Sequence, residues 1–127
     1  LAKIFSVGQP WSVSIPAQKA GIAATREDEY RRESKFLIDR ERVYLTEALK
    51  SLGYKVNPPT ANYVFFRVDT GKETFHEELR KAGFLIRDCS NYVGLTTGYF
   101  RIAVKTREDN EKLVAALTER EKKWQKR

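Results

Sequence analysis

Residues 84–105 read FLIRDCSNYVGLTTGYFRIAVK, and this stretch decides how the rest of the chain is organised. It contains two short apolar runs, 84–86 and 99–104, separated by a loop with two glycines and several small polar residues. Arg87 ends the first run and Arg101 lies inside the second. An arginine within a strand is costly unless its charge meets an anion. If the two runs pair as neighbouring strands, the two guanidinium groups face one site.

Side chains alternate between the two faces of a strand, so the second run predicts the face of each residue. Phe100, Ile102 and Val104 fall on one face, which is expected to meet the core. Arg101 falls on the other face beside Tyr99. A guanidinium group presents a planar fork of donors that matches a carboxylate or a phosphate. We therefore interpret Arg101 as a candidate anion-binding residue on the face away from the core.

Arg87 is the second candidate, because it precedes a long loop and loops at strand ends often carry binding groups. For each arginine, an ordinary surface charge or a structural salt bridge is the alternative interpretation. Cys89 follows closely, and we interpret it as a packing cysteine; the alternative is a reactive thiol whose pKa the charge of Arg87 lowers. His76 lies in a polar helical segment and is expected to face solvent. The acidic residues show no paired arrangement typical of acid–base catalysis.

Helical and strand patterns follow one another in the order helix, helix, strand, strand, helix, strand, strand, helix. The expected helices cover 11–24, with a start near Ile15 and Pro16 in the first turn, then 27–52, 72–82 and the segment that Thr106 caps. The expected strands cover 54–56, 61–68, 84–87 and 99–104. The run 61–68 is apolar on both faces and is expected to be a central strand.

This order predicts an α+β fold, in which a small and mainly antiparallel sheet has helices packed on one face. No linker divides the chain, so residues 1–127 are expected to form a single domain. Its parts are a lead-in and first helix at 1–24, a long helix at 27–52, and the other strands and helices at 54–127.

The long helix is predicted from an apolar stripe at helical spacing. The stripe consists of Ile38, Leu45, Leu49 and Leu52, broadened by Phe36, Tyr44 and Ala48. The end of the last helix, 119–127, is almost wholly polar and is expected to fray or to be solvated, apart from Trp124.

The composition limits the class of protein. Of 127 residues, 41% are apolar and 32% are charged, which suits one soluble globular domain and excludes a disordered chain. One cysteine and one histidine exclude an internal disulfide framework and a zinc site of the usual kind. A single cysteine also fits a reducing compartment, so a cytoplasmic location is expected.

The net charge of +7 raises the question of nucleic-acid binding. Basic and acidic residues are mixed along the expected helices, a pattern typical of a solvated surface. No apolar run approaches the ~20 residues that a membrane span needs. We therefore expect neither a nucleic-acid partner nor a membrane partner, although a non-enzymatic basic interaction domain remains an alternative.

Two segments resemble the C-terminal part of class I and II aminotransferase-fold enzymes, which use pyridoxal phosphate (PLP). They are ANYVFFRV at 61–68 and FLIRDCSNYVGLTTGYFRIAVKTREDNEKLVAAL at 84–117. The segment QPWSVSIPAQKAG at 9–21 resembles the stretch that leads into the C-terminal helices of these enzymes. Within the family, IRDCSNYVGL followed by GYFRIAVK is similar to threonine-phosphate decarboxylases of cobalamin synthesis, and histidinol-phosphate aminotransferases are near relatives.

The resemblance implies that Arg101 holds the α-carboxylate of a substrate and that Arg87 helps to hold the anionic end of a phosphorylated substrate. Asn62 matches a recurrent asparagine, which we interpret as a structural residue at a strand start. The implied activity is that of a PLP-dependent L-threonine O-3-phosphate decarboxylase. A histidinol-phosphate or related aminotransferase, in which the same arginines would serve, is the alternative.

The catalytic lysine of the family lies upstream of this region in a Ser-x-x-Lys segment, and Lys3 and Lys19 have no such context. We therefore assign no catalytic, cofactor-binding or metal-binding residue within this chain. The chain is expected to correspond to the small domain without the catalytic large domain, and to be inactive and free of PLP by itself. The resemblance implies that the parent enzyme binds PLP and a phosphorylated amino-acid substrate and is a homodimer.

Overall fold

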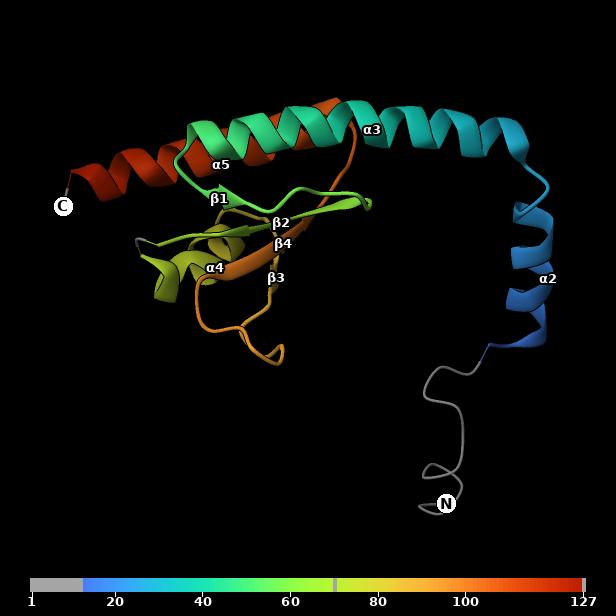
Figure 1. Ribbon diagram of the computed structural model, residues 1–127, viewed down its shortest axis with the longest axis horizontal. Coiled ribbons are helices and arrows are strands. Elements are labelled where there is room, and N and C mark those ends of the chain that lie inside the picture. The colour runs from blue at the N-terminus through green and yellow to red at the C-terminus, as the bar shows by residue number, and fades with distance from the viewer. Residues whose placement is uncertain (1–12, 70, 127) are drawn as a thin grey trace, which may run out of the picture. The chain divides into compact units, whose positions relative to one another are not determined.

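The computed structural model describes residues 13–69 and 71–126 of the chain. In these ranges it has four helices and one four-stranded antiparallel sheet, which confirms the predicted α+β class (Figure 1). The chain forms two compact units, Leu1–Ser34 and Lys35–Arg127, and helix α3 (Asp28–Ser51) runs across their boundary. The two units are described in turn.

The first unit contains helix α2 (Ile15–Ala24), which begins where the sequence predicted. The side chain of Ser14 caps it by accepting a hydrogen bond of 3.4 Å from the backbone N–H of Ala17. Pro16 lies in the first turn, where its missing N–H has no helical partner to lose. No α2 side chain is buried in the described part of the chain. The irregular lead-in expected at 1–10 lies outside the described residues.

The second unit is built on a sheet whose strands lie in the order β1-β2-β4-β3, each neighbouring pair being antiparallel. The strands are β1 (Lys55–Val56), β2 (Tyr63–Arg67), β3 (Arg87–Asp88) and β4 (Tyr99–Ala103). β2 is one of the two central strands, as the apolar content of its sequence predicted.

The strand expected at 84–87 is shorter than predicted, because its ladder begins only at Arg87. Gly83 ends the preceding helix with a φ of 88°. The backbone N–H of Phe84 then donates to the carbonyl of Leu79 at 2.9 Å. This hydrogen bond caps α4 (Lys72–Lys81) in the way that left-handed glycines allow. Residues 84–86 therefore complete the C-terminal cap of α4 and connect it to β3. The prediction of a strand at 84–86 is wrong.

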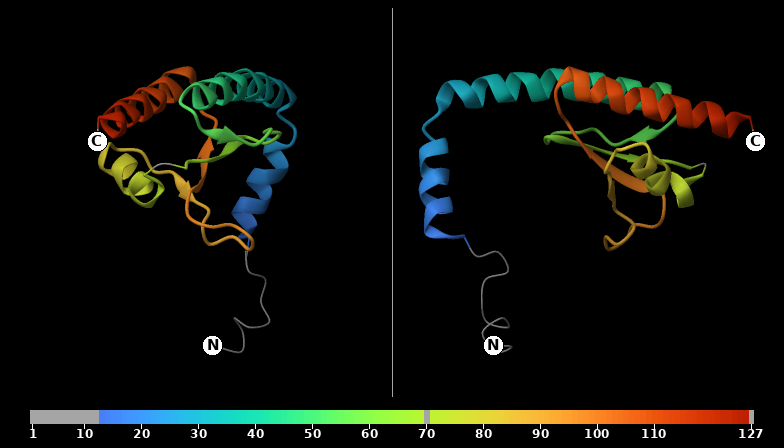
Figure 2. Two further views of the ribbon diagram at one scale, coloured as in Figure 1. Left: turned by 60° about the vertical axis from the view of Figure 1, so that its left-hand side comes forward. Right: turned by 180° about the vertical axis from the view of Figure 1, so that it is seen from behind.

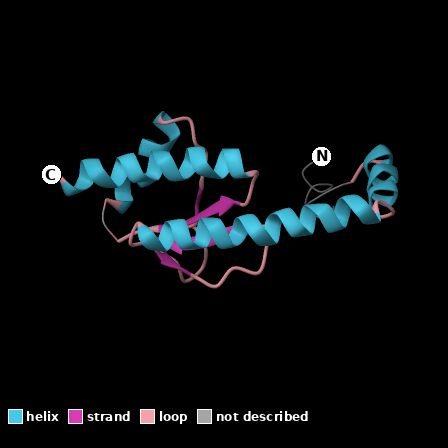
Figure 3. Ribbon diagram, turned by 90° about the horizontal axis from the view of Figure 1, so that it is seen from above, coloured by secondary structure: helices cyan, strands magenta, loops and turns pink. Residues whose placement is uncertain are grey.

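Helices α3, α4 and α5 (Arg107–Gln125) cover one face of the sheet, as predicted. Figures 1 and 3 show α3 and α5 side by side above the strands, and Figure 2 shows α4 beside α5. Phe75 of α4 lies at the centre of the core, where its ring centroid is 4.6 Å from Phe100 and 5.8 Å from Tyr54. The buried apolar residues around it are Leu45, Leu49, Val64, Phe66, Val68, Leu79, Ile86, Ile102, Leu113 and Leu117.

The face of α3 that meets the core differs from the predicted stripe at Phe36. Leu45 and Leu49 are buried, and Tyr44 and Leu52 are partly buried against the core, but Phe36 is 68% exposed. Nine residues separate Phe36 from Leu45, which is about two and a half helical turns. The two side chains therefore point to opposite sides of the helix, and including Phe36 in the stripe is wrong.

The polar end of α5 is helical to Gln125, and its lysines at 122, 123 and 126 are exposed as the sequence predicted, but Arg120 is buried. The side chain of Arg120 is only 5% exposed and donates to the carboxylate of Glu78 at 2.8 Å and to the carbonyl of Gly71 at 2.7 Å. The hydroxyl of Tyr54 donates to the carboxylate of Glu121 at 2.5 Å. Because these polar groups satisfy one another, the helix continues to Gln125 instead of fraying.

Gly71→Ala is expected to destabilise the chain by about 2–4 kcal/mol, as measured by urea unfolding. The φ of Gly71 is 61°, a conformation that side chains disfavour. A Cβ atom at this position would also overlap the ring of Trp124 and the guanidinium of Arg120.

Gly83→Ala is the matched control for this substitution. The φ of Gly83 is 88°, but a Cβ atom there would meet nothing within 4 Å. Gly83→Ala should therefore lower the free energy of unfolding only by the backbone penalty of about 1–2 kcal/mol. Equal losses in the two variants would mean that Trp124 and Arg120 do not constrain Gly71.

Candidate functional site

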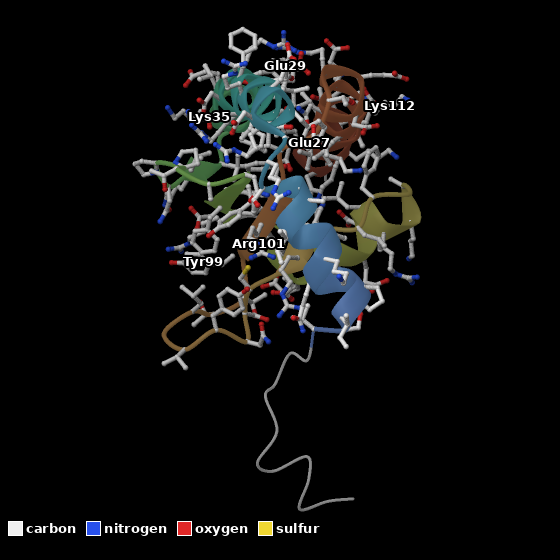
Figure 4. The ribbon with its side chains drawn as sticks, turned by 90° about the vertical axis from the view of Figure 1, so that its right-hand side faces the viewer. Glu27, Glu29, Lys35, Tyr99, Arg101 and Lys112 are labelled. Carbon is white, nitrogen blue, oxygen red and sulfur yellow. The ribbon has the colours of Figure 1, made fainter. Side chains whose placement is uncertain are left out.

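The two candidate arginines are direct cross-strand partners. β3 pairs with β4 so that Arg87 lies opposite Arg101, and directly opposed residues of an antiparallel pair share one face of the sheet. That face is the open one, because Phe100 and Ile102 of β4 point into the core and are 1% and 4% exposed. Figure 4 shows Arg101 and Tyr99 on the side of β4 away from α3 and α5. The sequence predicted this juxtaposition from the two apolar runs.

Arg87 and Arg101 also differ from the other arginines of the second unit, because the described residues provide neither of them with a carboxylate partner. Among the arginines described in the second unit, the others form ion pairs with carboxylates. These paired arginines are Arg40, Arg42, Arg67, Arg80, Arg107 and Arg120. Two like charges directly opposite each other destabilise a sheet. Such a local conflict is expected where a function needs it, and here the function would be to meet an anion.

Each of the two arginines lies over an aromatic ring instead. The guanidinium carbon of Arg101 is 4.8 Å from the ring centroid of Tyr63, and that of Arg87 is 5.8 Å from the ring of Tyr92. Both distances are within the range of cation–π attraction. Sequence reasoning missed both tyrosines. Alternation within ANYVFFRV could have placed Tyr63 on the open face, but the loop conformation that brings Tyr92 to Arg87 has no signal in the sequence.

Two shallow recesses on the open face share Arg101 and Tyr63. One, of about 440 Å³, is also lined by Arg87 and Asn62. The other, of about 320 Å³, is lined by the turn at 57–61 and by Tyr92. Arg101 therefore lines both recesses, and the larger one is also lined by the guanidinium group of Arg87. The arrangement can hold two anionic groups, or one group that carries more than a single charge.

Asn62 and Cys89 support this face through their backbone and their packing. The carbonyl of Asn62 accepts a hydrogen bond of 2.9 Å from the backbone N–H of Val104, which extends the ladder between β2 and β4. Cys89 is fully buried, and its thiol donates to the carbonyl of Arg87 at 3.7 Å. Burial raises the pKa of this thiol even though Arg101 and Arg87 act to lower it. Burial therefore outweighs the lowering of the pKa that the charge of Arg87 could give, in agreement with the interpretation of Cys89 as a packing residue.

A metal site and a membrane-spanning helix each place requirements on the described residues. No group of three or more His, Cys, Asp or Glu side chains there could hold a metal ion. None of the described helices is both long enough and apolar enough to cross a bilayer. His76 is partly exposed on α4, with Nδ1 3.8 Å from the carboxylate of Glu77.

The described residues that line the recesses offer groups that bind anions but no lysine that could hold PLP. PLP enzymes hold the cofactor through an imine on a lysine amino group. No lysine is among the described residues that line either recess. Lys19 lies on α2 in the first unit, and Lys3 lies outside the described residues. The chemistry available on this face is therefore the binding and orientation of anions.

Comparison with known proteins identifies the family. Residues 2–117 match the model of aminotransferase class I and II. Histidinol-phosphate aminotransferase 2 of Archaeoglobus fulgidus is 41% identical over 117 residues, which are 91% of this chain and 33% of the relative. A second relative, histidinol-phosphate aminotransferase of Methanosphaera stadtmanae, is 33% identical over 94% of this chain and 34% of its own length. The chain thus spans about a third of the length of the relatives it matches.

Solved structures agree with the sequence relatives. The histidinol-phosphate aminotransferase from Clostridium acetobutylicum is similar with a TM-score of 0.81 and 32% identity, over 96% of this chain and 37% of that one. The L-threonine-O-3-phosphate decarboxylase from Porphyromonas gingivalis is similar with a TM-score of 0.60 and 29% identity, over 65% of this chain and 26% of that one. The resemblance inferred from the sequence is confirmed, and the chain belongs to the class I and II aminotransferase family.

Proposed function

We propose that this chain is the anion-binding part of a PLP-dependent aminotransferase that acts on histidinol phosphate. The observation that carries the proposal is the opposed pair Arg87 and Arg101, which lack carboxylate partners among the described residues and share a recess on an open sheet face. Arg101 would hold the carboxylate of an amino or oxo acid, and Arg87 the phosphate of the amine substrate. PLP would supply the electron withdrawal that amino transfer requires.

The sequence interpretation put a threonine-phosphate decarboxylase first, and the comparisons support the aminotransferase better. Both sequence relatives described above act, by name, on histidinol phosphate, and the solved structure with the higher TM-score does so too. The decarboxylase stays the second candidate because of the similar structure from Porphyromonas gingivalis. Its substrate, phosphothreonine, carries a carboxylate and a phosphate together, and two recesses beside Arg101 suit a molecule with two anionic groups.

Two assays on the protein that carries this chain separate the candidates. The first follows glutamate formation from L-histidinol phosphate and 2-oxoglutarate, and the second follows CO2 release from O-phospho-L-threonine. We expect efficient amino transfer and little CO2 release. If CO2 release is the faster reaction, the aminotransferase proposal is wrong and the decarboxylase takes its place. The absence of both reactions would contradict the proposed enzyme class.

Arg87→Ala in the same protein is expected to lower kcat/KM for L-histidinol phosphate by about 10- to 100-fold, because a charge-assisted hydrogen bond to phosphate is lost. For L-histidinol, which lacks the phosphate, the loss should stay below about threefold. Steady-state kinetics with both substrates measure the two effects. Equal losses for both substrates would remove Arg87 from the phosphate site.

The 127-residue chain by itself is expected not to form an imine with PLP, because no lysine lines the recesses in the described part of the chain. Absorbance spectra of the chain mixed with PLP, before and after borohydride, measure imine formation. A stoichiometric imine band that borohydride converts to a single modified lysine would overturn this expectation.

A further inference from the structure

We propose that Tyr63 is a positioning residue, which holds the guanidinium of Arg101 in place before an anion arrives. The inference rests on the proposed anion-binding role of Arg101. The ring centroid of Tyr63 lies 4.8 Å from the guanidinium carbon. Both side chains line the two recesses of the open face. Figure 4 shows where Arg101 projects from β4.

The register of the sheet explains why Tyr63 reaches Arg101. Tyr63 lies directly opposite Ala103, and Arg101 lies directly opposite Phe65. Tyr63 and Arg101 are therefore diagonal neighbours on one face, a separation that aromatic and long side chains can bridge. Ala103, directly opposite Tyr63, has a small side chain, and the ring of Tyr63 contacts the guanidinium of the neighbouring Arg101.

The charge environment explains why Arg101 needs this contact. Arg87 lies directly opposite with the same charge, and the described residues offer Arg101 no carboxylate. Repulsion would turn the guanidinium away from Arg87, and the long side chain has many rotamers in which to do so. The negative face of an aromatic ring attracts the cation without neutralising it. The contact with Tyr63 thus fixes the fork while leaving its charge available to a ligand.

The two arginines differ in how firmly they are held. Tyr63 belongs to β2 and is paired with Ala103 of β4 in the ladder of the sheet. The corresponding contact of Arg87 is longer, at 5.8 Å, and comes from Tyr92 in a loop. We therefore expect the guanidinium group of Arg101 to keep one position on this face, and that of Arg87 to be more mobile.

The first test needs no ligand and uses NMR of the 15N-labelled chain. The heteronuclear NOE of the Arg101 Nε–Hε group reports the order of this side chain. Tyr63→Ile removes the ring but keeps a residue that favours strands, and it should lower this NOE. Tyr63→Phe keeps the ring and should preserve it. Tyr44→Leu is the control, because Tyr44 lies 3.9 Å from the guanidinium carbon of Arg107, whose acidic partner is Glu41. This control should leave the Arg101 signal unchanged.

The second test measures binding of O-phospho-L-threonine by the same signals. Tyr63→Ile should weaken binding about fivefold, whereas Tyr63→Phe should stay within about twofold of the wild type. In an Arg101→Gln background, Tyr63→Ile should have no further effect, because a positioning residue acts only through Arg101. A backbone 15N–1H spectrum of each variant verifies that the fold is kept, and Tyr63→Val serves as a second ring-free variant.

The outcomes separate the two inferences. An unchanged NOE in both ring-free variants, or an equal loss of affinity with and without Arg101, would overturn the role of Tyr63 alone. If the wild-type chain and Arg101→Gln bind the probe equally, the anion-binding role of Arg101 fails, and the inference on Tyr63 fails with it.

Discussion

Arg101→Gln is expected to lower kcat/KM of the protein that carries this chain by about 100-fold or more, mainly through KM. Glutamine keeps a polar end but loses the charge and the two-pronged donor fork. A hydrogen bond to a charged group contributes about 1.5–3 kcal/mol, and about 1.4 kcal/mol corresponds to a factor of ten in rate. Steady-state kinetics with L-histidinol phosphate and 2-oxoglutarate measure the effect, which should be largest in the KM of the oxo acid.

Arg67→Gln is the matched control for this substitution. Arg67 lies on the same sheet face, over the ring of Tyr99, but it is paired with the carboxylate of Asp69 at 2.8 Å. Because its charge is already partnered, its loss should change kcat/KM by less than about threefold. If Arg101→Gln behaves like Arg67→Gln, Arg101 does not touch the substrate.

Glu41→Gln is expected to lower the free energy of unfolding by about 2–4 kcal/mol at neutral pH. Glu41 is 0% exposed, yet it is charged. Its carboxylate accepts hydrogen bonds from Nε of Arg40 at 2.9 Å, from Nε of Arg107 at 3.3 Å and from Nδ2 of Asn110 at 3.2 Å. These contacts join α3 to the start of α5. A neutral amide in the same place is a weaker hydrogen-bond acceptor than a carboxylate. Its NH2 group would also face the NH2 group of Asn110, and two donors cannot bond each other.

The loss of stability in Glu41→Gln should become smaller as the pH falls. Burial alone would raise the pKa of Glu41, but the hydrogen bonds from Arg107, Asn110 and Arg40 outweigh it and lower the pKa below its ordinary value of 4.5. A carboxyl group whose pKa is lower in the folded state stabilises the protein above the unfolded pKa. That stabilisation is lost as the pH falls through the folded value. The stability difference between wild type and Glu41→Gln should therefore be full at pH 7 and should shrink below about pH 4.5.

Glu47→Gln on the same helix is the control for Glu41. The side chain of Glu47 is 68% exposed, and its carboxylate pairs with Lys50 at 3.1 Å. Such exposed pairs contribute little, so the change should stay below about 0.5 kcal/mol. Urea unfolding of the wild type and both variants between pH 3 and pH 7 measures all the effects. A Glu41 difference that does not vary with pH would contradict the account of a buried, charged carboxylate.

The placement of the arginine pair could be predicted from the sequence because it depends on local rules. Side chains alternate between the two faces of a strand with a period of two. This rule placed Arg101 on the face of the sheet opposite to the one that carries Phe100 and Ile102. Two apolar runs separated by one loop were sufficient to suggest that Arg87 would lie next to Arg101. The start of β3 was missed because the Gly83 turn holds Phe84 in the cap of α4, and capping competes with strand pairing at that point.

The end of α5 could not be predicted, because its order depends on partners far away in the sequence. Arg120 reads as one more charge in a solvated tail, but the structure pairs it with Glu78 and Gly71 from another part of the chain. The direction of the pKa shift of Cys89 also depends on the tertiary fold. The adjacent charge of Arg87 is visible in the sequence, whereas the burial that outweighs it arises only from the tertiary fold.

The central claim is that Arg87 and Arg101 together form an anion site, and a phosphate titration tests it most directly. The 15N-labelled chain is titrated with inorganic phosphate while the arginine Nε–Hε signals are followed. The account predicts that the signals of Arg87 and Arg101 shift together along one saturating curve. Arg67 and Arg107, which have carboxylate partners, should stay in place. Signals of Arg87 and Arg101 that do not move, or that drift like those of all other arginines, would contradict the claim.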